Sequence, residues 1–310
     1  MKKDLLGLKD ISASEIELIL DTAAEMKKLF SKKGKKSNLL EGQTVSTLFF
    51  ENSTRTRLSF ETASNFLGAH FMAISASTSS VSKGETFIDT GKNLDAILID
   101  AIVIRHPMGG APHLLAKNVK ASVINGGDGT SEHPTQALLD FLTMREKFSK
   151  IKGLKVVLCG DIKFSRVARS NIWGLLKLGA EVTVCAPYTL LPKGMEDFGV
   201  KVELNPAKAI ANADVIMGLR IQSERQNMGV FPSVGEYAKF FSITEEVIKK
   251  AKAEKAIIMH PGPANRGVEM SGEVLDSKNS VVLEQVTNGV AVRMAVLKLL
   301  LEARARGVKS

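Results

Sequence analysis

Short apolar runs alternate with amphipathic segments along most of the chain. Runs typical of buried strands lie at residues 44–50, 69–74, 101–104 and 121–124, and again at 155–159, 181–185, 200–204, 214–219 and 256–259. Apolar residues at helical spacing predict helices at 54–67, 85–94, 134–148 and 165–178. A first helix begins at a capping box of Ser12 and Glu15, and a long amphipathic helix covers 286–304.

This alternation predicts an α/β protein with two domains. Strands that alternate with helices form parallel sheets joined by right-handed crossovers. A length of 310 residues also suits two domains, at about 150 residues each. We therefore expect two domains, each a mainly parallel sheet flanked by helices and linked by helices, over residues 1–150 and 151–285. The sequence leaves open whether the C-terminal helix, 286–310, packs back on the first domain.

Composition indicates a folded protein without a membrane span. Apolar residues make up 44% of the chain and charged residues 24%, so a sizeable core can form. The most apolar candidate span, residues 96–104, is interrupted by Asp100, and acidic residues soon follow the N-terminus, so we expect neither a membrane span nor a signal peptide. Cys159 and Cys185 are too few for a disulfide scaffold or a zinc cluster, and we expect two small buried residues and a cytoplasmic protein.

The net charge of +9 allows three interpretations. It arises from 42 Lys and Arg against 33 Asp and Glu, with the densest basic run at residues 32–36. A basic chain can bind nucleic acid, but only 5% of the residues are aromatic, so base-stacking platforms are scarce. The other interpretations are a solvated lysine-rich surface and a field that attracts small anionic substrates.

Three polar loops interrupt the pattern, and each follows a predicted strand. They cover residues 75–84, 220–232 and 260–270. Long polar loops either carry function or are plain surface connections. Because the ligand crevice of an open α/β sheet lies at the carboxyl ends of its strands, their position favours function.

The most informative motif is Ser53-Thr54-Arg55-Thr56-Arg57, between the first strand and the next helix. Ser53 is a good N-cap residue, but the first helical turn carries arginine where Asp or Glu is favoured. Free N–H groups, three hydroxyls and an arginine fork suit a phosphate. The alternative is that both arginines reach surface carboxylates. A Walker loop is absent, and the turn at residues 160–162 does not continue as Gly-x-Gly-x-x-Gly, so a nucleotide site is not supported.

Further polar residues lie at strand ends of the same predicted sheet. Arg105 follows the third strand, and His133 precedes a helix that begins at Pro134 and carries Gln136. A histidine beside a helix N-terminus resists protonation, so His133 can act as a neutral hydrogen-bond donor. It can equally be a capping or packing residue. His106, which precedes a proline, is expected to be structural.

The second predicted domain has its own polar groups just past strand ends. Arg166 and Arg220 can hold a dicarboxylate through paired N–H···O bonds. The alternative is surface ion pairing with Asp161 or Glu224. The run His260-Pro261-Gly262-Pro263 holds backbone carbonyls in a rigid turn, which can accept hydrogen bonds from an amine or serve only as a loop.

Together these motifs resemble those of the aspartate/ornithine carbamoyltransferase family. The resemblance rests on Ser53-Thr54-Arg55-Thr56-Arg57, on His133-Pro134-Thr135-Gln136 and on the two-domain order, and it covers nearly the whole chain. It implies transfer of a carbamoyl group from carbamoyl phosphate to an amino-acid amine by direct attack. It also implies that no metal and no other cofactor is needed.

The same motifs favour aspartate over ornithine as the acceptor. Ornithine enzymes typically carry His-Cys-Leu-Pro where this chain has His260-Pro261-Gly262-Pro263, and Arg220-Ile221-Gln222 is similar to the aspartate-binding Arg-x-Gln. An arginine suits the side-chain carboxylate of aspartate and repels the ammonium of ornithine. The implied product is N-carbamoyl-L-aspartate, in pyrimidine biosynthesis; the alternative is a carbamoyltransferase acting on ornithine or a related amine.

The resemblance implies a role for each matching residue. Phosphate is held by Ser53, Thr54, Arg55 and Thr56. The carbamoyl oxygen accepts hydrogen bonds from Thr56, Arg105 and His133, and Gln136 bonds the carbamoyl NH₂. The acceptor's carboxylates are bound by Arg166, Arg220 and Gln222, and its amine meets the turn at Pro261 and Gly262. The implied catalytic residues are Arg55, Thr56, Lys83, Arg105 and His133.

The resemblance also implies partners. In the family, a serine and a lysine of the polar loop, here Ser79 and Lys83, reach the site of a neighbouring subunit, which implies a homotrimer with shared active sites. Family members often associate with regulatory chains or with dihydroorotase. Nucleic acid and membranes are not expected as partners. The rival from another class, a non-catalytic scaffold or nucleic-acid-binding protein, leaves the converging arginines and hydroxyls unexplained.

Overall fold

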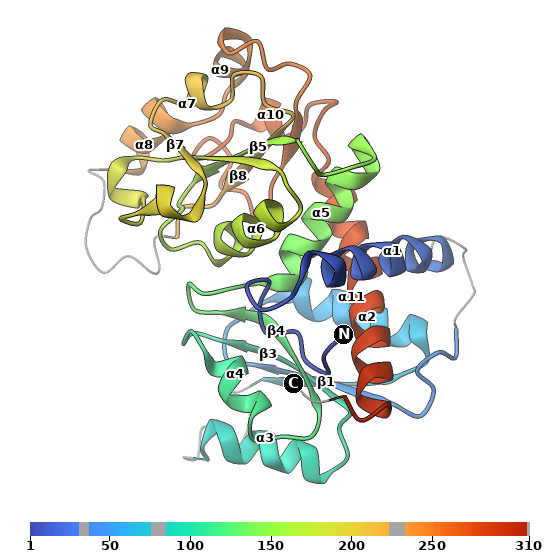
Figure 1. The fold of residues 1–310 in the computed structure, drawn as a ribbon. Helices are drawn as coiled ribbons and strands as arrows, with labels where there is room; N and C mark the ends of the chain where they lie inside the picture. The colour runs from blue at the N-terminus through green and yellow to red at the C-terminus, as the bar shows by residue number, and fades with distance from the viewer. Residues whose placement is uncertain (31–36, 76–84, 223–232, 309–310) are drawn as a thin grey trace. The chain divides into compact units, whose positions relative to one another are not determined.

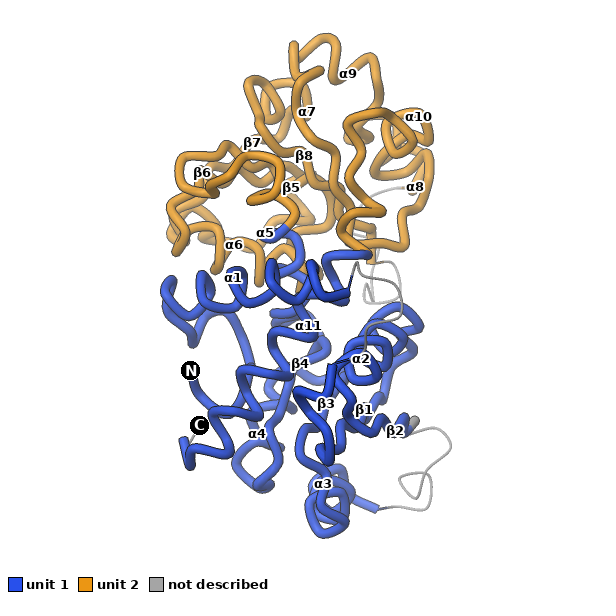
Figure 2. Tube along the Cα trace, turned by 90° about the vertical axis from the view of Figure 1, so that its right-hand side faces the viewer, with its two compact units in different colours: residues 1–142, 287–310 blue, residues 143–286 orange. Residues whose placement is uncertain are grey.

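The computed structural model describes residues 1–30, 37–75, 85–222 and 233–308, and it divides the chain into two compact units. Unit 1 comprises residues 1–142 and 287–310, and unit 2 comprises 143–286 (Figure 2). The chain crosses between units within α5 (Pro134–Phe148) and again within α11 (Val282–Ala305). The end of α11 is fixed to unit 1, because Arg304 Nη1 lies 2.6 Å from Asp100 Oδ1.

Unit 1 is built on a parallel sheet with the strand order β2-β1-β3-β4. The strands are β1 (Thr44–Phe49), β2 (His70–Ser75), β3 (Ala101–His106) and β4 (Ser122–Asp128). The helices are α1 (Ala13–Phe30), α2 (Thr54–Leu67), α3 (Phe87–Ala96) and α4 (Ala111–Ala116), with parts of α5 and α11. Figure 1 shows α2 and α11 over one face of the sheet and α3 and α4 over the other, as right-handed crossovers require for this strand order.

Apolar burial holds α3 and α4 against the sheet. Their side chains Leu94 and Leu115 share one cluster with Leu48, Ile102 and Val123 of the strands. Each of these side chains is at most 4% exposed, and burying a leucine of this kind contributes about 1.5–3 kcal/mol. The loops at the carboxyl ends of the strands therefore start from fixed positions.

Unit 2 repeats the plan with the strand order β7-β6-β5-β8-β9. The strands are β5 (Lys155–Gly160), β6 (Glu181–Cys185), β7 (Lys201–Glu203), β8 (Val215–Leu219) and β9 (Ile257–Met259). The α-helices are α6 (Arg166–Lys177), α7 (Pro206–Ala209), α8 (Val234–Phe241), α9 (Glu245–Lys250) and α10 (Gly272–Leu275), with two 3₁₀ turns, η3 (Tyr188–Leu190) and η4 (Met195–Phe198). All pairs of named strands in both described sheets are parallel, so the predicted fold class is confirmed.

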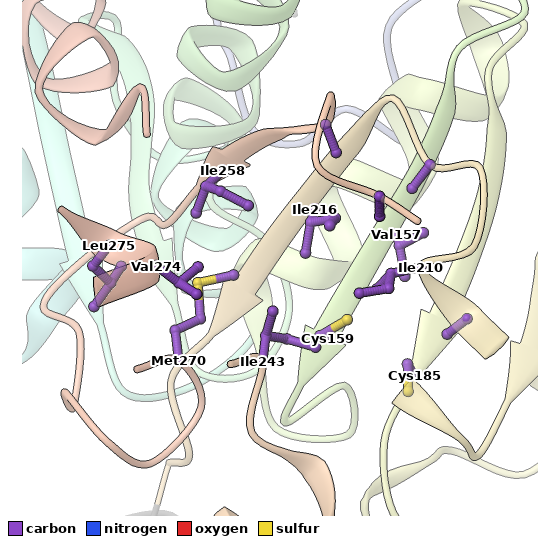
Figure 3. Packing of buried hydrophobic residues seen from close by; sticks show 14 residues of the cluster. Val157, Cys159, Cys185, Ile210, Ile216, Ile243, Ile258, Met270, Val274 and Leu275 are labelled. Atoms are coloured by element: carbon purple, nitrogen blue, oxygen red, sulfur yellow. The ribbon is translucent and has the colours of Figure 1, made fainter. Parts of the chain in front are cut away.

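The two cysteines lie in the core of unit 2 and do not form a disulfide bond. Cys159 and Cys185 are register partners on β5 and β6, each is 2% exposed, and both belong to the cluster in Figure 3. A hydrogen bond with Cys185, and then burial, raise the pKa of the Cys159 thiol well above its usual value. The expectation of small buried residues is confirmed.

The structure confirms one predicted helix start and contains one helix that the sequence analysis missed. The capping box is confirmed, because Ser12 N–H donates to Glu15 Oε2 at 2.9 Å and Glu15 N–H donates to Ser12 Oγ at 3.2 Å. Helix α4 is missed, because Gly109-Gly110 before Pro112 has the composition of a turn; Pro112 in fact occupies the first helical turn, where proline is tolerated.

No helix in the described part of the chain is long and apolar enough to cross a bilayer.

Candidate active site

The predicted site residues of unit 1 gather where its sheet changes winding direction. The strand order places β1 beside β3, so the chain runs to β2 on one side and to β4 on the other. Phe49 pairs with Arg105 at the ends of these strands, and Phe50 N–H donates to the Arg105 carbonyl at 2.8 Å. Ligands of open α/β sheets bind at such a switch point, outside the carboxyl ends of the strands.

Helix α2 begins shortly after β1, and its N-terminus has no capping side-chain hydrogen bond. Ser53 occupies the N-cap position, but its hydroxyl makes no capping hydrogen bond, which differs from the prediction of a good N-cap. The first turn holds no acidic residue and carries Arg55 and Arg57, both exposed, while Thr56 is buried. An anion at this terminus satisfies N–H groups and offsets both the helix dipole and the arginine charge.

Arg105 is held at the end of β3 by two neighbours. Its Nε lies 3.3 Å from Glu51 Oε2, and its Nη1 donates to the Gly126 carbonyl of β4 at 3.2 Å. Glu51 precedes the α2 motif by two positions. The guanidinium therefore lies across the ends of β1, β3 and β4, next to a carboxylate that competes with any incoming anion.

The loop that leads to His133 is fixed by buried acidic residues. Asp128 Oδ1 accepts from Glu132 N–H at 3.0 Å and from Asn125 Nδ2 at 2.8 Å, and its Oδ2 accepts from Gly110 N–H at 2.7 Å. Glu132 itself accepts from the backbone N–H of Leu8 at 2.7 Å. His133 is 5% exposed directly before α5, so this network sets where its ring lies.

His106 supports the same end of the sheet by packing. Its ring lies 4.6 Å from the Phe50 ring and 5.3 Å from the Phe87 ring, and its Nδ1 accepts from Met108 N–H at 3.1 Å. Burial lowers the pKa of His106, against the opposing charges of Glu51 and Asp128. These contacts agree with the structural role expected for it.

Unit 2 has the corresponding switch point between β5 and β8. Gly160 at the end of β5 has φ +135°, and a Cβ there would lie 2.0 Å from the Leu219 carbonyl oxygen, so only glycine allows this approach of the strands. The next residue, Asp161, is buried and accepts from the backbone N–H of Gln222 at 3.1 Å. This hydrogen bond joins the segments that follow β5 and β8, next to the predicted acceptor residue Arg220.

The predicted acceptor residues of unit 2 surround this point. Arg220 and Gln222 bond each other twice: Arg220 Nη2 donates to Gln222 Oε1 at 3.2 Å, and Gln222 Nε2 donates to the Arg220 carbonyl at 3.3 Å. Arg166 begins α6 and is 4% exposed. A ligand carboxylate can replace the glutamine oxygen on the Arg220 guanidinium, with stronger charge-assisted bonds.

The turn at Pro261 and Gly262 is held by a buried histidine. His260 Nδ1 accepts from Gly262 N–H at 2.8 Å, so Nε2 carries the proton and donates to Glu269 Oε1 at 3.0 Å. Both side chains are completely buried. This clamp fixes the backbone carbonyls that follow β9.

Each predicted residue in the described part of the chain thus lies at the end of a strand of its own unit, or in the loop or first helical turn that follows one. In unit 1, the N-cap and first turn of α2 hold Ser53, Thr54, Arg55 and Thr56, the end of β3 holds Arg105, and the start of α5 holds His133 and Gln136. Unit 2 holds Arg166, Arg220, Gln222, Pro261 and Gly262. Ser79, Lys83, Glu224 and the basic run at 32–36 lie outside the described residues. Within those residues, no group of three or more His, Cys, Asp or Glu is placed to hold a metal ion.

Sequence reasoning overlooked the acidic residues behind the site. Glu51, Asp128 and Glu132 each contact a predicted site residue or its loop. A signal for Glu132 exists in the sequence, since it directly precedes His133-Pro134. Asp128 gives no such signal, because its partners depend on the tertiary fold.

Two family models cover almost the entire chain. The carbamoyl-P binding domain of aspartate/ornithine carbamoyltransferase matches residues 3–146, and the Asp/Orn binding domain of the same family matches 152–300. Together they match well over half of the sequence. Their order follows that of the two units.

Individual relatives give the same result. The aspartate carbamoyltransferase catalytic subunit of Ruminiclostridium cellulolyticum is 61% identical over 298 residues, covering 96% of this chain and 95% of that protein. Aspartate transcarbamoylase from Trypanosoma cruzi in complex with carbamoyl phosphate and aspartate has a TM-score of 0.85 at 30% identity, covering 95% of each chain. Ornithine carbamoyltransferase from Pyrococcus furiosus has a TM-score of 0.84 at 38% identity, covering 96% of this chain and 97% of that one.

Proposed function

This chain belongs to the aspartate/ornithine carbamoyltransferase family, and we propose that it transfers the carbamoyl group of carbamoyl phosphate to the α-amine of L-aspartate. The products are N-carbamoyl-L-aspartate and phosphate, and the reaction is an early step of pyrimidine biosynthesis. The observation that carries the proposal is the pair of switch points. One presents an anion-ready helix terminus with Arg105, and the other presents Arg220 with Gln222.

Unit 1 supplies the donor site in this proposal. Ser53, Thr54, Arg55 and Thr56 hold the phosphate at the N-terminus of α2. Thr56, Arg105 and His133 donate hydrogen bonds to the carbamoyl oxygen, whose negative charge grows as the tetrahedral intermediate forms. Arg55 and Lys83 offset the charge of the departing phosphate.

Unit 2 supplies the acceptor site. Arg166, Arg220 and Gln222 bind the two carboxylates of aspartate. The carbonyls of Pro261 and Gly262 accept from its amine and orient the nitrogen lone pair for attack. The amine attacks the carbamoyl carbon, the C–O bond to phosphate breaks, and the phosphate carries away the bonding electrons and accepts the amine's proton. Holding donor and acceptor together supplies much of the rate enhancement.

The acceptor distinguishes this proposal from the ornithine alternative. Likeness of fold does not separate the two, because solved structures of both enzymes match at similar TM-scores. Relatives from Ruminiclostridium cellulolyticum, Caldanaerobacter subterraneus and Moorella thermoacetica, at 61%, 59% and 55% identity, are aspartate carbamoyltransferase catalytic subunits. The side chain that meets the acceptor is a guanidinium, which favours a carboxylate over an ammonium.

The proposal includes an assembly and a location. We propose a homotrimer in the cytoplasm, in which Ser79 and Lys83 of one subunit complete the site of the next. Association with a regulatory chain or with dihydroorotase stays a prediction from the family resemblance.

A ureido-product assay tests the proposed reaction. Purified protein receives carbamoyl phosphate with either L-aspartate or L-ornithine, beside Arg55→Ala and the exposed control Arg306→Ala. We expect aspartate-dependent product, a loss of at least about a hundredfold in Arg55→Ala, and wild-type rates in Arg306→Ala. Turnover with ornithine alone would contradict the assignment of Arg220 and Gln222.

A further inference from the structure

Two buried charged residues of unit 1, one acidic and one basic, are not among the residues assigned a role so far. Asp140 is on α5, one helical turn after Gln136, and is fully buried. Arg293 is on α11 and is 3% exposed. Both belong to unit 1.

Asp140 determines which end of the Gln136 side chain faces the site. Gln136 Nε2 donates to Asp140 Oδ1 at 3.0 Å. An ionised carboxylate only accepts hydrogen bonds, so it must face the NH₂ group of the amide and never its oxygen. The amide oxygen of Gln136 is therefore turned away from Asp140, and it can accept one hydrogen bond from a ligand.

Arg293 keeps a positive charge beside this carboxylate. Burial lowers the pKa of Arg293 to about 10, against the opposing effect of the Asp140 charge, so the guanidinium is protonated at neutral pH. It stacks over the Phe60 ring of α2 at 5.2 Å, and its Nη1 donates to the Gly289 carbonyl at 2.9 Å. The cation stabilises the ionised form of Asp140, which is the form that fixes the amide.

The structure makes deliberate room for this guanidinium. A Cβ at Gly289 would lie 2.7 Å from Arg293 Nη1 and 3.2 Å from Leu139 Cδ2, so the glycine leaves room for both side chains. Glycine inside a helix costs about 1 kcal/mol relative to alanine. Arg293 is also a charged residue in the middle of an apolar stretch, from Val290 to Leu297. Buried charges persist when they have a specific partner.

We infer that Asp140, supported by Arg293, is a positioning residue that makes Gln136 a hydrogen-bond acceptor and thereby selects a ligand with an NH₂ group on its carbonyl carbon. The inference rests on the carbamoyl phosphate site proposed above. With the amide reversed, Gln136 would offer an NH₂ group to the ligand's NH₂ group, and the site would lose its preference for a carbamoyl over an acyl group.

Two stable phosphonates of the same shape test this inference. Phosphonoacetamide carries the NH₂ group, and 2-oxopropylphosphonate carries a methyl group in its place. Dissociation constants of both, and of inorganic phosphate, are measured by calorimetry. We expect the wild-type protein to prefer the amide by about tenfold, the value of one hydrogen bond of about 1.4 kcal/mol.

The variants separate orientation of Gln136 from general damage. Asp140→Leu/Arg293→Met removes both charges together, so no buried charge is left unpaired. Asp140→Asn keeps the shape but can donate as well as accept. Leu139→Ala is the matched control, because it truncates a buried side chain in the same helix turn and leaves the Gln136–Asp140 hydrogen bond and both charges in place.

We expect Asp140→Leu/Arg293→Met to lose the preference for the amide and Asp140→Asn to reduce it, with phosphate affinity within about twofold of wild type, and Leu139→Ala to keep the preference. An unchanged preference in the folded Asp140 variants would overturn the inference, as would a parallel loss of affinity for all three ligands. If the wild-type protein bound phosphate but bound the two phosphonates equally well, the inference would be overturned, because Gln136 would not be selecting the NH₂ group. Failure to bind any of the three would contradict the proposed function itself, and the inference with it.

Discussion

At the scale of single residues, the predicted substrate-binding arginines lie beside polar or acidic groups with which a substrate anion would compete. Arg220 bonds the neutral oxygen of Gln222, and the helix terminus at Arg55 has no acidic residue in its first turn. Arg105 contacts Glu51 at a distance of 3.3 Å and is partly exposed. An anionic substrate can replace the neutral Gln222 oxygen on Arg220 with a gain in charge-assisted hydrogen bonding, whereas at Arg105 it competes with the Glu51 carboxylate.

Replacing Arg220 separates acceptor binding from donor binding. Arg220→Met keeps the length of the side chain and removes the guanidinium, so we expect the KM for aspartate to rise by about tenfold to a hundredfold. The KM for carbamoyl phosphate should stay within about twofold, because that ligand is assigned to unit 1. Steady-state kinetics with each substrate varied in turn measures both values. Equal increases for the two substrates would contradict the assignment.

The packing of His106 gives a pH dependence with a definite sign. Burial lowers the pKa of His106 from 6.5 in the folded state. As pH falls through 6.5, the unfolded chain therefore takes up a proton that the folded chain does not, and stability decreases. We expect the urea concentration at the unfolding midpoint to be lower at about pH 5.5 than at about pH 7.5 in the wild-type protein, and to decrease less in His106→Gln. Glutamine is chosen because its side-chain oxygen can accept the hydrogen bond that Met108 N–H donates to His106. Identical slopes in both proteins would contradict this account.

At the scale of elements, the starts of α6 and α2 differ in their capping. Ser165 caps α6 by accepting from Ala168 N–H at 3.1 Å, whereas Ser53 at the start of α2 makes no such bond. Both residues have the same side chain at the same helix position, with φ and ψ of −90° and 108° at Ser165 and −158° and 88° at Ser53. The uncapped terminus is the one that we assign to phosphate.

These two serines form a matched pair of substitutions. Ser165→Ala removes a capping bond and should cost about 1 kcal/mol of unfolding free energy. Ser53→Ala removes no such bond and should cost less than about 0.5 kcal/mol, while phosphate affinity falls by about tenfold. Urea denaturation and calorimetry give the two quantities. A large stability loss in Ser53→Ala without loss of phosphate affinity would assign Ser53 to the helix alone.

The sequence was informative about elements and strand ends, and less so about their supports. Periodicity places the strands and most helices to within a few residues, and parallel strands bring Ser53 and Arg105 to one edge without any further knowledge. It could not identify α4, which is only six residues long. Asp128 and Asp140 act through partners that only the folded chain brings near, although Arg293 in an apolar helix was a visible anomaly.

At the scale of the whole molecule, the proposed homotrimer places residues of two chains in each active site. In the proposed trimer, Arg55 of one subunit works with Lys83 of the next. Arg55→Ala and Lys83→Ala should each be inactive, but a mixed trimer contains sites in which both residues are native. Random mixing in equal amounts places native residues together in about a quarter of the sites. We expect activity near that fraction of wild type after the variants are dissociated and reassembled together. No recovery in confirmed mixed trimers would contradict shared sites.

The central claim is formation of a bond between the carbamoyl carbon and the α-nitrogen of aspartate, and isotope-edited NMR observes that bond directly. Carbamoyl phosphate labelled with ¹³C is supplied with ¹⁵N-labelled L-aspartate and unlabelled L-ornithine in equal amounts. We predict that the carbamoyl carbon signal of the product splits through one-bond coupling to ¹⁵N, in step with phosphate release. An unsplit product signal would mean that ornithine is the acceptor, and release of phosphate with labelled bicarbonate alone would mean that the protein transfers the group to neither amine.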